Sequence, residues 1–245
     1  IGGAGDDAAY GITIDSQGRL CIAGETRSTD FPVLKAWQAR PGGETDAFLA
    51  RLDPTAQFLL FSSYIGAEND DRAYSVAIDS ADSLYVAGET ASLDLPVTNA
   101  VQAHFGGGMW DAFLVKFAPD NMDPLFVTYF GGSGDDRAFA VAPNAIGEAA
   151  LAGETSSTNL PAWEALQPAH GGGRWDGFAA RIGSSGSNLV FCTYLGGAQA
   201  DHLYAATTEA GRLLHVAGQT ASPDLRVANA LQSKHAGGGT DGLLA

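Results

Sequence analysis

The chain has 245 residues and a formal net charge of −15, with 13 Lys and Arg against 28 Asp and Glu. Hydrophobic residues make up 45% of it and charged residues 17%, so it can bury a substantial core and is not a disordered chain. The negative charge repels nucleic-acid phosphates, and no run is long and apolar enough to span a bilayer. We therefore expect neither nucleic acid as a partner nor membrane insertion.

One segment recurs at a fixed period. The opening IGGAGDD returns as IGAENDD at Ile65, FGGSGDD at Phe130 and LGGAQAD at Leu195, in steps of 64, 65 and 65 residues. Such a period indicates supersecondary units that stack and cover one another's hydrophobic faces. We divide the chain, as one domain, into four units: 1–64, 65–129, 130–194 and 195–245.

The first unit contains four predicted strands. Residues 8–15 (AAYGITID) alternate around β-branched residues, and the turn at 16–18 leads into a second strand at 20–24 (LCIAG). The third strand, 46–53 (DAFLARLD), alternates apolar and polar residues, and the fourth, 58–65 (FLLFSSYI), enters the next unit. The long connection between the second and third strands has about twenty residues. It contains a short stretch, around Gln38, Gln102, Gln167 and Gln232, that could be helical.

The later units repeat this pattern, and the fourth stops at Ala245 inside its third strand. Four short antiparallel strands with turn signals between them describe the blade of a β-propeller. We expect an all-β fold, a β-propeller of four blades of about 65 residues with the last blade incomplete, or an arc of a larger ring. The first residue is Ile, not Met, which suggests a piece of a longer protein, and the full blade number stays open.

These motifs resemble the bacterial β-propeller repeats called SBBP. The resemblance rests on G-G-x-G-D-D-x-A, on D-S-x-G-x-x-Y-V-A-G-x-T-x-S-x-D-F-P and on G-G-x-x-D-A-F, and it covers essentially the whole chain. Ala200, Asn159 and Arg226 depart from the pattern, so the units need not all share one chemistry. The resemblance implies a secreted or cell-surface bacterial protein, and it implies no established activity.

In an antiparallel sheet, the connection from the second to the third strand and the connection from the fourth strand to the next unit emerge at the same end. Most of the repeated acidic residues lie in these two connections, so they gather at one end of the predicted sheets. Either they hold the loops through Asx-type hydrogen bonds, or they bind Ca²⁺, which takes about 6–8 oxygen ligands. No EF-hand loop is present. The candidate metal ligands are Asp7, Asp71, Asp136 and Asp201 after the glycine-rich turns, and Asp46, Asp111, Asp176 and Asp241 at the ends of the long connections.

Five further residues at the same end are candidate ligand-binding residues. Glu25, Glu89 and Glu154 begin the long connections, and Trp110 and Trp175 precede the aspartates that end them. Tryptophan rings there can simply pack the loop on its blade, or they can form a platform for a glycan or a peptide. Arg72 and Arg137 follow the Asp pairs, and we expect them to screen neighbouring acids at the surface.

We expect a non-catalytic extracellular or surface module for rigid recognition or spacing, with a protein or glycan at its acidic face. No nucleophile elbow or phosphate-binding loop is present. One alternative is a carboxylate-based polysaccharide hydrolase or lyase, although no specific pair can be named. Another is an architectural subunit of a cell-surface assembly. Ligand identity, bound metal, ring closure, export signal and oligomeric state are left open.

Overall fold

The computed structural model describes residues 1–209 and 213–245, and all regular elements in these ranges are β-strands. The first unit holds β1 (Asp7–Ile14), β2 (Leu20–Thr26), β3 (Asp46–Leu52) and β4 (Leu59–Ile65), and the second β5 (Asp71–Ile78), β6 (Leu84–Thr90), β7 (Asp111–Phe117) and β8 (Pro124–Phe130). The third holds β9 (Asp136–Pro143), β10 (Ala149–Thr155), β11 (Asp176–Ile182) and β12 (Leu189–Leu195), and the last β13 (Asp201–Glu209), β14 (Leu213–Thr220) and β15 (Asp241–Leu244). The four expected strands of the first unit are present, with their ends moved by one or two residues.

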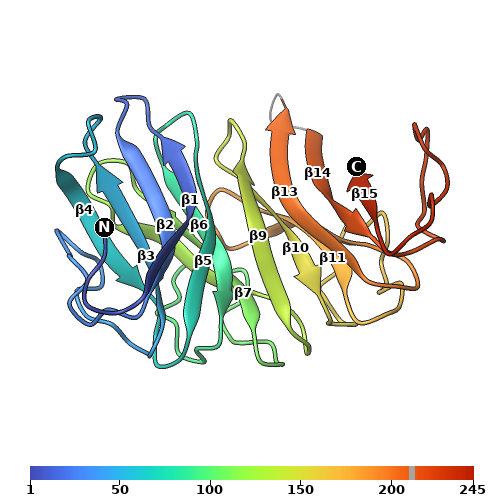
Figure 1. Cartoon of the computed structure of the whole chain (residues 1–245), viewed down its shortest axis with the longest axis horizontal. Coiled ribbons are helices and arrows are strands. Elements are labelled where there is room, and N and C mark those ends of the chain that lie inside the picture. The colour runs from blue at the N-terminus through green and yellow to red at the C-terminus, as the bar shows by residue number, and fades with distance from the viewer. Residues whose placement is uncertain (210–212) are drawn as a thin grey trace.

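Each unit forms one antiparallel sheet whose strands are paired in chain order, and the last sheet has three strands. The fold is therefore all-β, with sheets consistent with propeller blades. The sheets follow one another in a row, with the chain ends at opposite ends of it (Figure 1). The first strands, β1, β5, β9 and β13, contact one another in that order along the row. The residues covered by the structure include no helix long and apolar enough to cross a membrane.

The short helix expected in the long connection is wrong for the part of the chain that the structure covers. The connection instead runs along the outer strand of its own sheet and makes isolated β-bridges with it, such as Gln38 with Tyr64 and Trp163 with Cys192. Lys35, Asn99 and Glu164 adopt φ values of 53°, 48° and 47° in this stretch. A single left-handed residue interrupts a helix, and the bridges satisfy the backbone groups that a helix would have paired internally.

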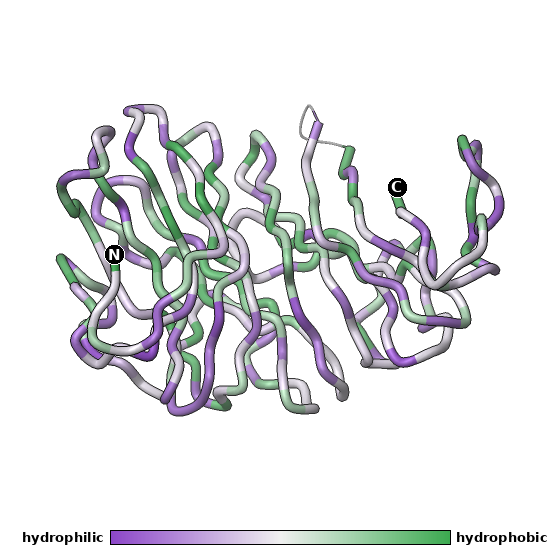
Figure 2. The backbone as a smooth tube through the Cα atoms, viewed as in Figure 1, coloured by the Kyte–Doolittle hydropathy of each residue, from purple (hydrophilic) through white to green (hydrophobic). Residues whose placement is uncertain are grey.

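The hydrophobic core lies between neighbouring sheets. Leu49 and Phe61 of the first sheet are buried in one cluster with Val86, Phe113 and Val115 of the second, and a similar cluster joins the second sheet to the third. A smaller cluster joins the third sheet to the last one. Figure 2 shows long hydrophobic stretches along the strands. Both faces of a strand are covered in the middle of the row, which explains why β6, β7, β10 and β11 are buried at every residue.

Every first strand contains one residue that is skipped in the pairing with the second strand. The pairing of β5 with β6 passes from Ala73–Gly88 to Ser75–Ala87, so Tyr74 has no partner across the ladder. The skipped residues of the four sheets are Tyr10, Tyr74, Phe139 and Tyr204. Such a β-bulge bends the strand and redirects the side chain of the extra residue.

Candidate binding site

The four bulge residues form a continuous row of aromatic rings, here named the aromatic row (Tyr10, Tyr74, Phe139 and Tyr204). Neighbouring ring centroids are 5.7, 5.3 and 5.7 Å apart from one end to the other. These separations lie within the range of favourable aromatic contacts. Tyr10 and Tyr204 at the two ends are 51% and 47% exposed, so the row is open to solvent at both ends. The sequence already contained this signal, because an aromatic residue stands three positions after the second Asp of every unit.

Charged side chains form a second row beside the aromatic rings. We call it the charge ladder. Glu25, Arg72, Glu89, Arg137 and Glu154 alternate in sign, and His202 ends the row. Arg72 places Nε 2.7 Å from Glu25 and Nη1 2.9 Å from Glu89. Each arginine thus bridges the glutamate of its own sheet and that of the preceding sheet, and the ladder ties neighbouring sheets together.

Arg137 repeats this arrangement at the next junction. Its Nε lies 2.6 Å from Glu89 and its Nη1 2.7 Å from Glu154. At the last junction His202 takes the place of the arginine, with Nδ1 2.5 Å from Glu154. Arg72 and Arg137 therefore do screen neighbouring acids, as expected, and they also join neighbouring sheets. Arg72 also contacts Asp70 at 3.1 Å. The side chains of Arg72 and Arg137 are 20% and 22% exposed, and each arginine holds two glutamates.

Hydrogen bonds connect the aromatic row to the charge ladder. The hydroxyl of Tyr10 donates to Glu25 at 2.9 Å, and that of Tyr74 donates to Glu89 at 2.8 Å. Burial and the nearby Glu89 carboxylate raise the pKa of Tyr74, so its hydroxyl keeps the proton that it donates. The hydroxyls of Tyr10 and Tyr74 are therefore held in place by the glutamates of the charge ladder.

The two predicted tryptophans complete this region. The guanidinium of Arg72 lies 4.7 Å from the ring centre of Trp110, and that of Arg137 lies 4.9 Å from Trp175. Cation–π contacts of this kind orient both partners. The structure therefore brings together all five candidate ligand-binding residues, Glu25, Glu89, Glu154, Trp110 and Trp175, around two arginines. Their binding role stays a prediction.

The candidate metal ligands lie deeper, and six of the eight form pairs at the junctions between sheets. The pairs are Asp46 with Asp71, Asp111 with Asp136, and Asp176 with Asp201, and each of these residues is at most 1% exposed. Asp7 and Asp241 lie in the first and last sheets and have no such partner among the residues that the structure describes. The structure thus divides one set of repeated residues into three pairs and two single carboxylates.

Much of the hydrogen bonding of these aspartates is internal to the loops. Asp136 accepts hydrogen bonds from the backbone of Gly132 at 2.7 Å and from the hydroxyls of Ser157 and Thr155. Asp111 accepts one from the backbone of Gly106 at 2.6 Å. These contacts fix the glycine-rich turns, as the Asx interpretation of the sequence requires.

Burial strongly affects the ionisation of the paired aspartates. Burial raises the pKa of Asp71 and of Asp111 to about 7, and the carboxylates of Asp46 and Asp136, respectively, add to the rise. Burial likewise raises the pKa of Asp46, Asp136 and Asp176 to about 6. The charged form of each is disfavoured because little water reaches it.

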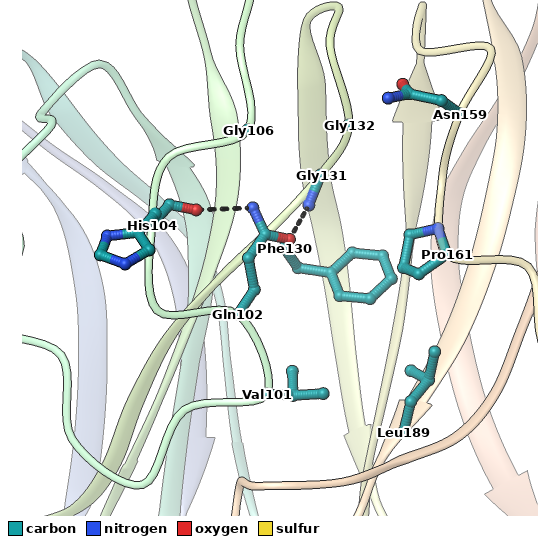
Figure 3. Close-up of a pocket in the computed structure, with 10 residues that line it drawn as sticks. All are labelled: Val101, Gln102, His104, Gly106, Phe130, Gly131, Gly132, Asn159, Pro161 and Leu189. Carbon is teal, nitrogen blue, oxygen red and sulfur yellow. Dashed lines mark hydrogen bonds between the residues drawn. The ribbon is translucent and has the colours of Figure 1, made fainter.

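A pocket of about 470 Å³ opens at the junction between the second and third sheets (Figure 3). Phe130, Pro161 and Leu189 supply apolar walls, and the side-chain amide of Gln102 lies between them and His104. That amide donates to the carbonyl of His104 at 2.9 Å and accepts from the backbone of Gly131 at 2.9 Å. It also donates to Asp111 Oδ2 at 3.1 Å, so the wall of the pocket contacts a buried carboxylate.

Repeated antiparallel sheets, tied together through their first strands, define an all-β repeat protein of the kind found in propellers. Residues 60–96 match the family model of a beta-propeller repeat, SBBP. This match confirms the resemblance to the SBBP-type repeat family, and the matched segment includes Asp71, Arg72 and Glu89. No curated protein matches the chain.

Proposed function

We propose that the chain is a non-catalytic recognition module of the bacterial cell surface or exterior. It is an arc of four propeller blades, the last incomplete, with a rigid contact surface at its loop-covered end. A protein or a glycan binds there, against the aromatic row and the charge ladder. The exposed acids of the surrounding loops, such as Asp30 and Asp94, give this surface its negative charge.

The observation that carries this proposal is the aromatic row itself. Sugar rings and the flat parts of peptides pack well on aromatic faces, and nearby carboxylates and guanidinium groups supply oriented hydrogen bonds. The row is held by bulged backbone and by hydroxyl contacts to Glu25 and Glu89, so little side-chain freedom is lost when a ligand binds.

A hydrolase or lyase needs a carboxyl group that reaches the substrate and can give up or accept a proton. Glu89 and Glu154 are only 3% and 7% exposed. Both of them, and Glu25, are already bound by an arginine. The aspartates with raised pKa are at most 1% exposed, beneath the loops. This distribution favours binding over catalysis.

Binding to an immobilised panel of polysaccharides and peptides tests the proposal. We expect Phe139→Ala to weaken binding at least tenfold, since it interrupts the aromatic row at its centre. Phe58→Ala is the matched control, because Phe58 is 66% exposed in a turn outside the row. Equal effects of the two substitutions, or release of sugar products from the panel, would contradict a non-catalytic recognition role.

A further inference from the structure

The paired aspartates at each junction converge on one glycine. A methyl group added to Gly131 would lie 2.6 Å from Asp136 Oδ2 and 3.1 Å from Asp111 Oδ1. One added to Gly196 would lie 2.6 Å from Asp176 Oδ1 and 2.9 Å from Asp201 Oδ2. Two carboxylates from different sheets thus approach each other closely, and the four residues of these two pairs are 0% exposed.

Cationic side chains do not neutralise these pairs. Within residues 1–209 and 213–245, the one ion-pair contact to them is His170, whose Nδ1 lies 3.8 Å from Asp176 Oδ1. That nitrogen also accepts a hydrogen bond from the backbone of Gly172 at 3.2 Å, and its distance to Asp176 is too long for a hydrogen bond. Two uncompensated negative charges in a buried site are costly, and proteins rarely keep them without a counter-charge.

Four buried oxygens of the paired carboxylates have no hydrogen-bond donor among the described residues: Asp71 Oδ1, Asp111 Oδ1, Asp176 Oδ1 and Asp201 Oδ1. Two of the four lie where the paired carboxylates converge. Asp111 Oδ1 and Asp176 Oδ1 accept no hydrogen bond from the described residues, and both residues are 0% exposed. The same two oxygens face the glycine on which the pair converges. In the first junction the two oxygens that face Gly66 both have donors: Asp46 Oδ1 accepts a hydrogen bond from the backbone of Gly42, and Asp71 Oδ2 accepts one from the backbone of Ala67.

We propose that the second and third junctions each bind one divalent cation, with Ca²⁺ as the best-suited ion, between Asp111 and Asp136 and between Asp176 and Asp201. The unpartnered oxygen of Asp111 or Asp176 is a ligand, and the facing Asp136 or Asp201 supplies the second carboxylate. A hard cation with oxygen ligands provides the missing positive charge without displacing the loop hydrogen bonds.

The remaining ligands are main-chain oxygens and water. No group of three or more His, Cys, Asp or Glu side chains that could hold a metal gathers within the two ranges that the structure covers. Two carboxylates per ion predict a modest affinity, with a Kd of about 10⁻⁴–10⁻³ M, as in extracellular calcium modules. At the second junction, the pocket in Figure 3 includes Gly131 in its lining and gives the ion a path from solvent.

Isothermal titration of the EDTA-treated chain with CaCl₂ tests the proposal, with MgCl₂ in parallel. We expect two sites per chain and a rise in Tm of several degrees at saturating Ca²⁺. Asp111→Asn removes one site and leaves one. Asp46→Asn is the matched control, since it occupies the equivalent position in the first junction and should leave two sites.

A second measurement needs no substitution of an aspartate. Trp110 and Trp175 directly precede Asp111 and Asp176, so Tb³⁺ bound in place of Ca²⁺ should show luminescence on excitation of tryptophan, and Ca²⁺ should quench it by competition. The proposal is overturned if Ca²⁺ and Mg²⁺ give neither heat nor a change in Tm and Tb³⁺ shows no sensitised emission. It is also overturned if Asp46→Asn lowers the number of sites as much as Asp111→Asn does. Ligand binding by the aromatic row can persist in either case, so the two proposals fail separately.

Discussion

The first and second sheets have nearly the same sequence motifs but different surroundings. The second sheet has a neighbour on both faces, whereas the first has one only on the side of β5. Val76 on β5 is 7% exposed, and Ile12, at the same position of β1, is 67% exposed. In a repeat protein, burial is thus a property of the junction and not of the unit, since each unit completes the core of the next.

The same comparison holds for ionisable groups. Asp7 and Asp71 occupy equivalent positions, yet their pKa values move in opposite directions. Slight burial acts to raise the pKa of Asp7, but hydrogen bonds from Thr26, Gly3 and Ser28 outweigh it and lower the pKa overall. For Asp71 burial dominates and raises the pKa to about 7. The presence of a neighbouring sheet therefore changes the sign of the pKa shift at this position.

The largest expected effect concerns the charge ladder. Glu89 is 3% exposed and holds both arginines, whereas Glu25 lies at the end of the ladder and holds only Arg72. Glu89→Ala should lower the free energy of unfolding by about 3 kcal/mol, because each arginine loses one of its two glutamates and the hydroxyl of Tyr74 loses its acceptor. Glu25→Ala should cost about 1 kcal/mol. Urea unfolding measures both, and equal losses would show that the ladder does not join the sheets.

The next effect is on the dependence of stability on pH in metal-free buffer. Between the ordinary pKa of 3.8 and about 7, Asp71 stays protonated in the folded chain but ionises in the unfolded chain. Its contribution to stability is therefore lost as the pH rises through this window, by on the order of 2 kcal/mol. For Asp7, whose folded pKa is lowered, stability is instead present above 3.8 and lost as the pH falls.

Unfolding curves at several pH values between about 2 and 8 measure these slopes. Asp71→Asn should flatten the fall in stability toward neutral pH, and Asp7→Asn should flatten the fall toward acid pH. Parallel curves for the two variants would contradict the opposite signs of the pKa shifts.

The smallest expected effect compares the two apolar positions directly. Val76→Ala should lower the free energy of unfolding by about 1.5 kcal/mol, because it opens a cavity between two sheets. Ile12→Ala removes a larger side chain but should cost less than about 0.5 kcal/mol, since that side chain is mostly exposed. If a partner covers β1 under the conditions of the measurement, the cost at Ile12 should approach that at Val76.

Sequence reasoning was strong where a local pattern determines the structure. Alternation and turn residues predicted the strands of the first unit, and the period predicted equivalent sheets. The helix in the long connection was wrong, because Gln38 and Trp163 pair with an outer strand that is distant in sequence. Tertiary backbone pairing of this kind leaves no trace in local periodicity.

The site was predictable only in part. The antiparallel order correctly placed the glutamates and tryptophans at one end of the sheets, but it could not show that arginines join them across junctions. Asp111 and Asp136 lie 25 positions apart in the sequence, and nothing in the spacing reveals that they meet at Gly131. An alignment of the four units among themselves would have revealed Tyr10 and Tyr74 as equivalent aromatic positions.

The extra residue in each first strand places one side chain outside the regular alternation between the two faces of the sheet. Residues on either side of Tyr74 keep their regular pairing with β6, so their side chains continue to pack against the two neighbouring sheets. The side chain at the bulge contacts the equivalent rings of the neighbouring sheets and is not part of the core clusters between them. Its identity can therefore vary without repacking the core, which makes these four positions a natural place for diversification of specificity on an unchanged scaffold.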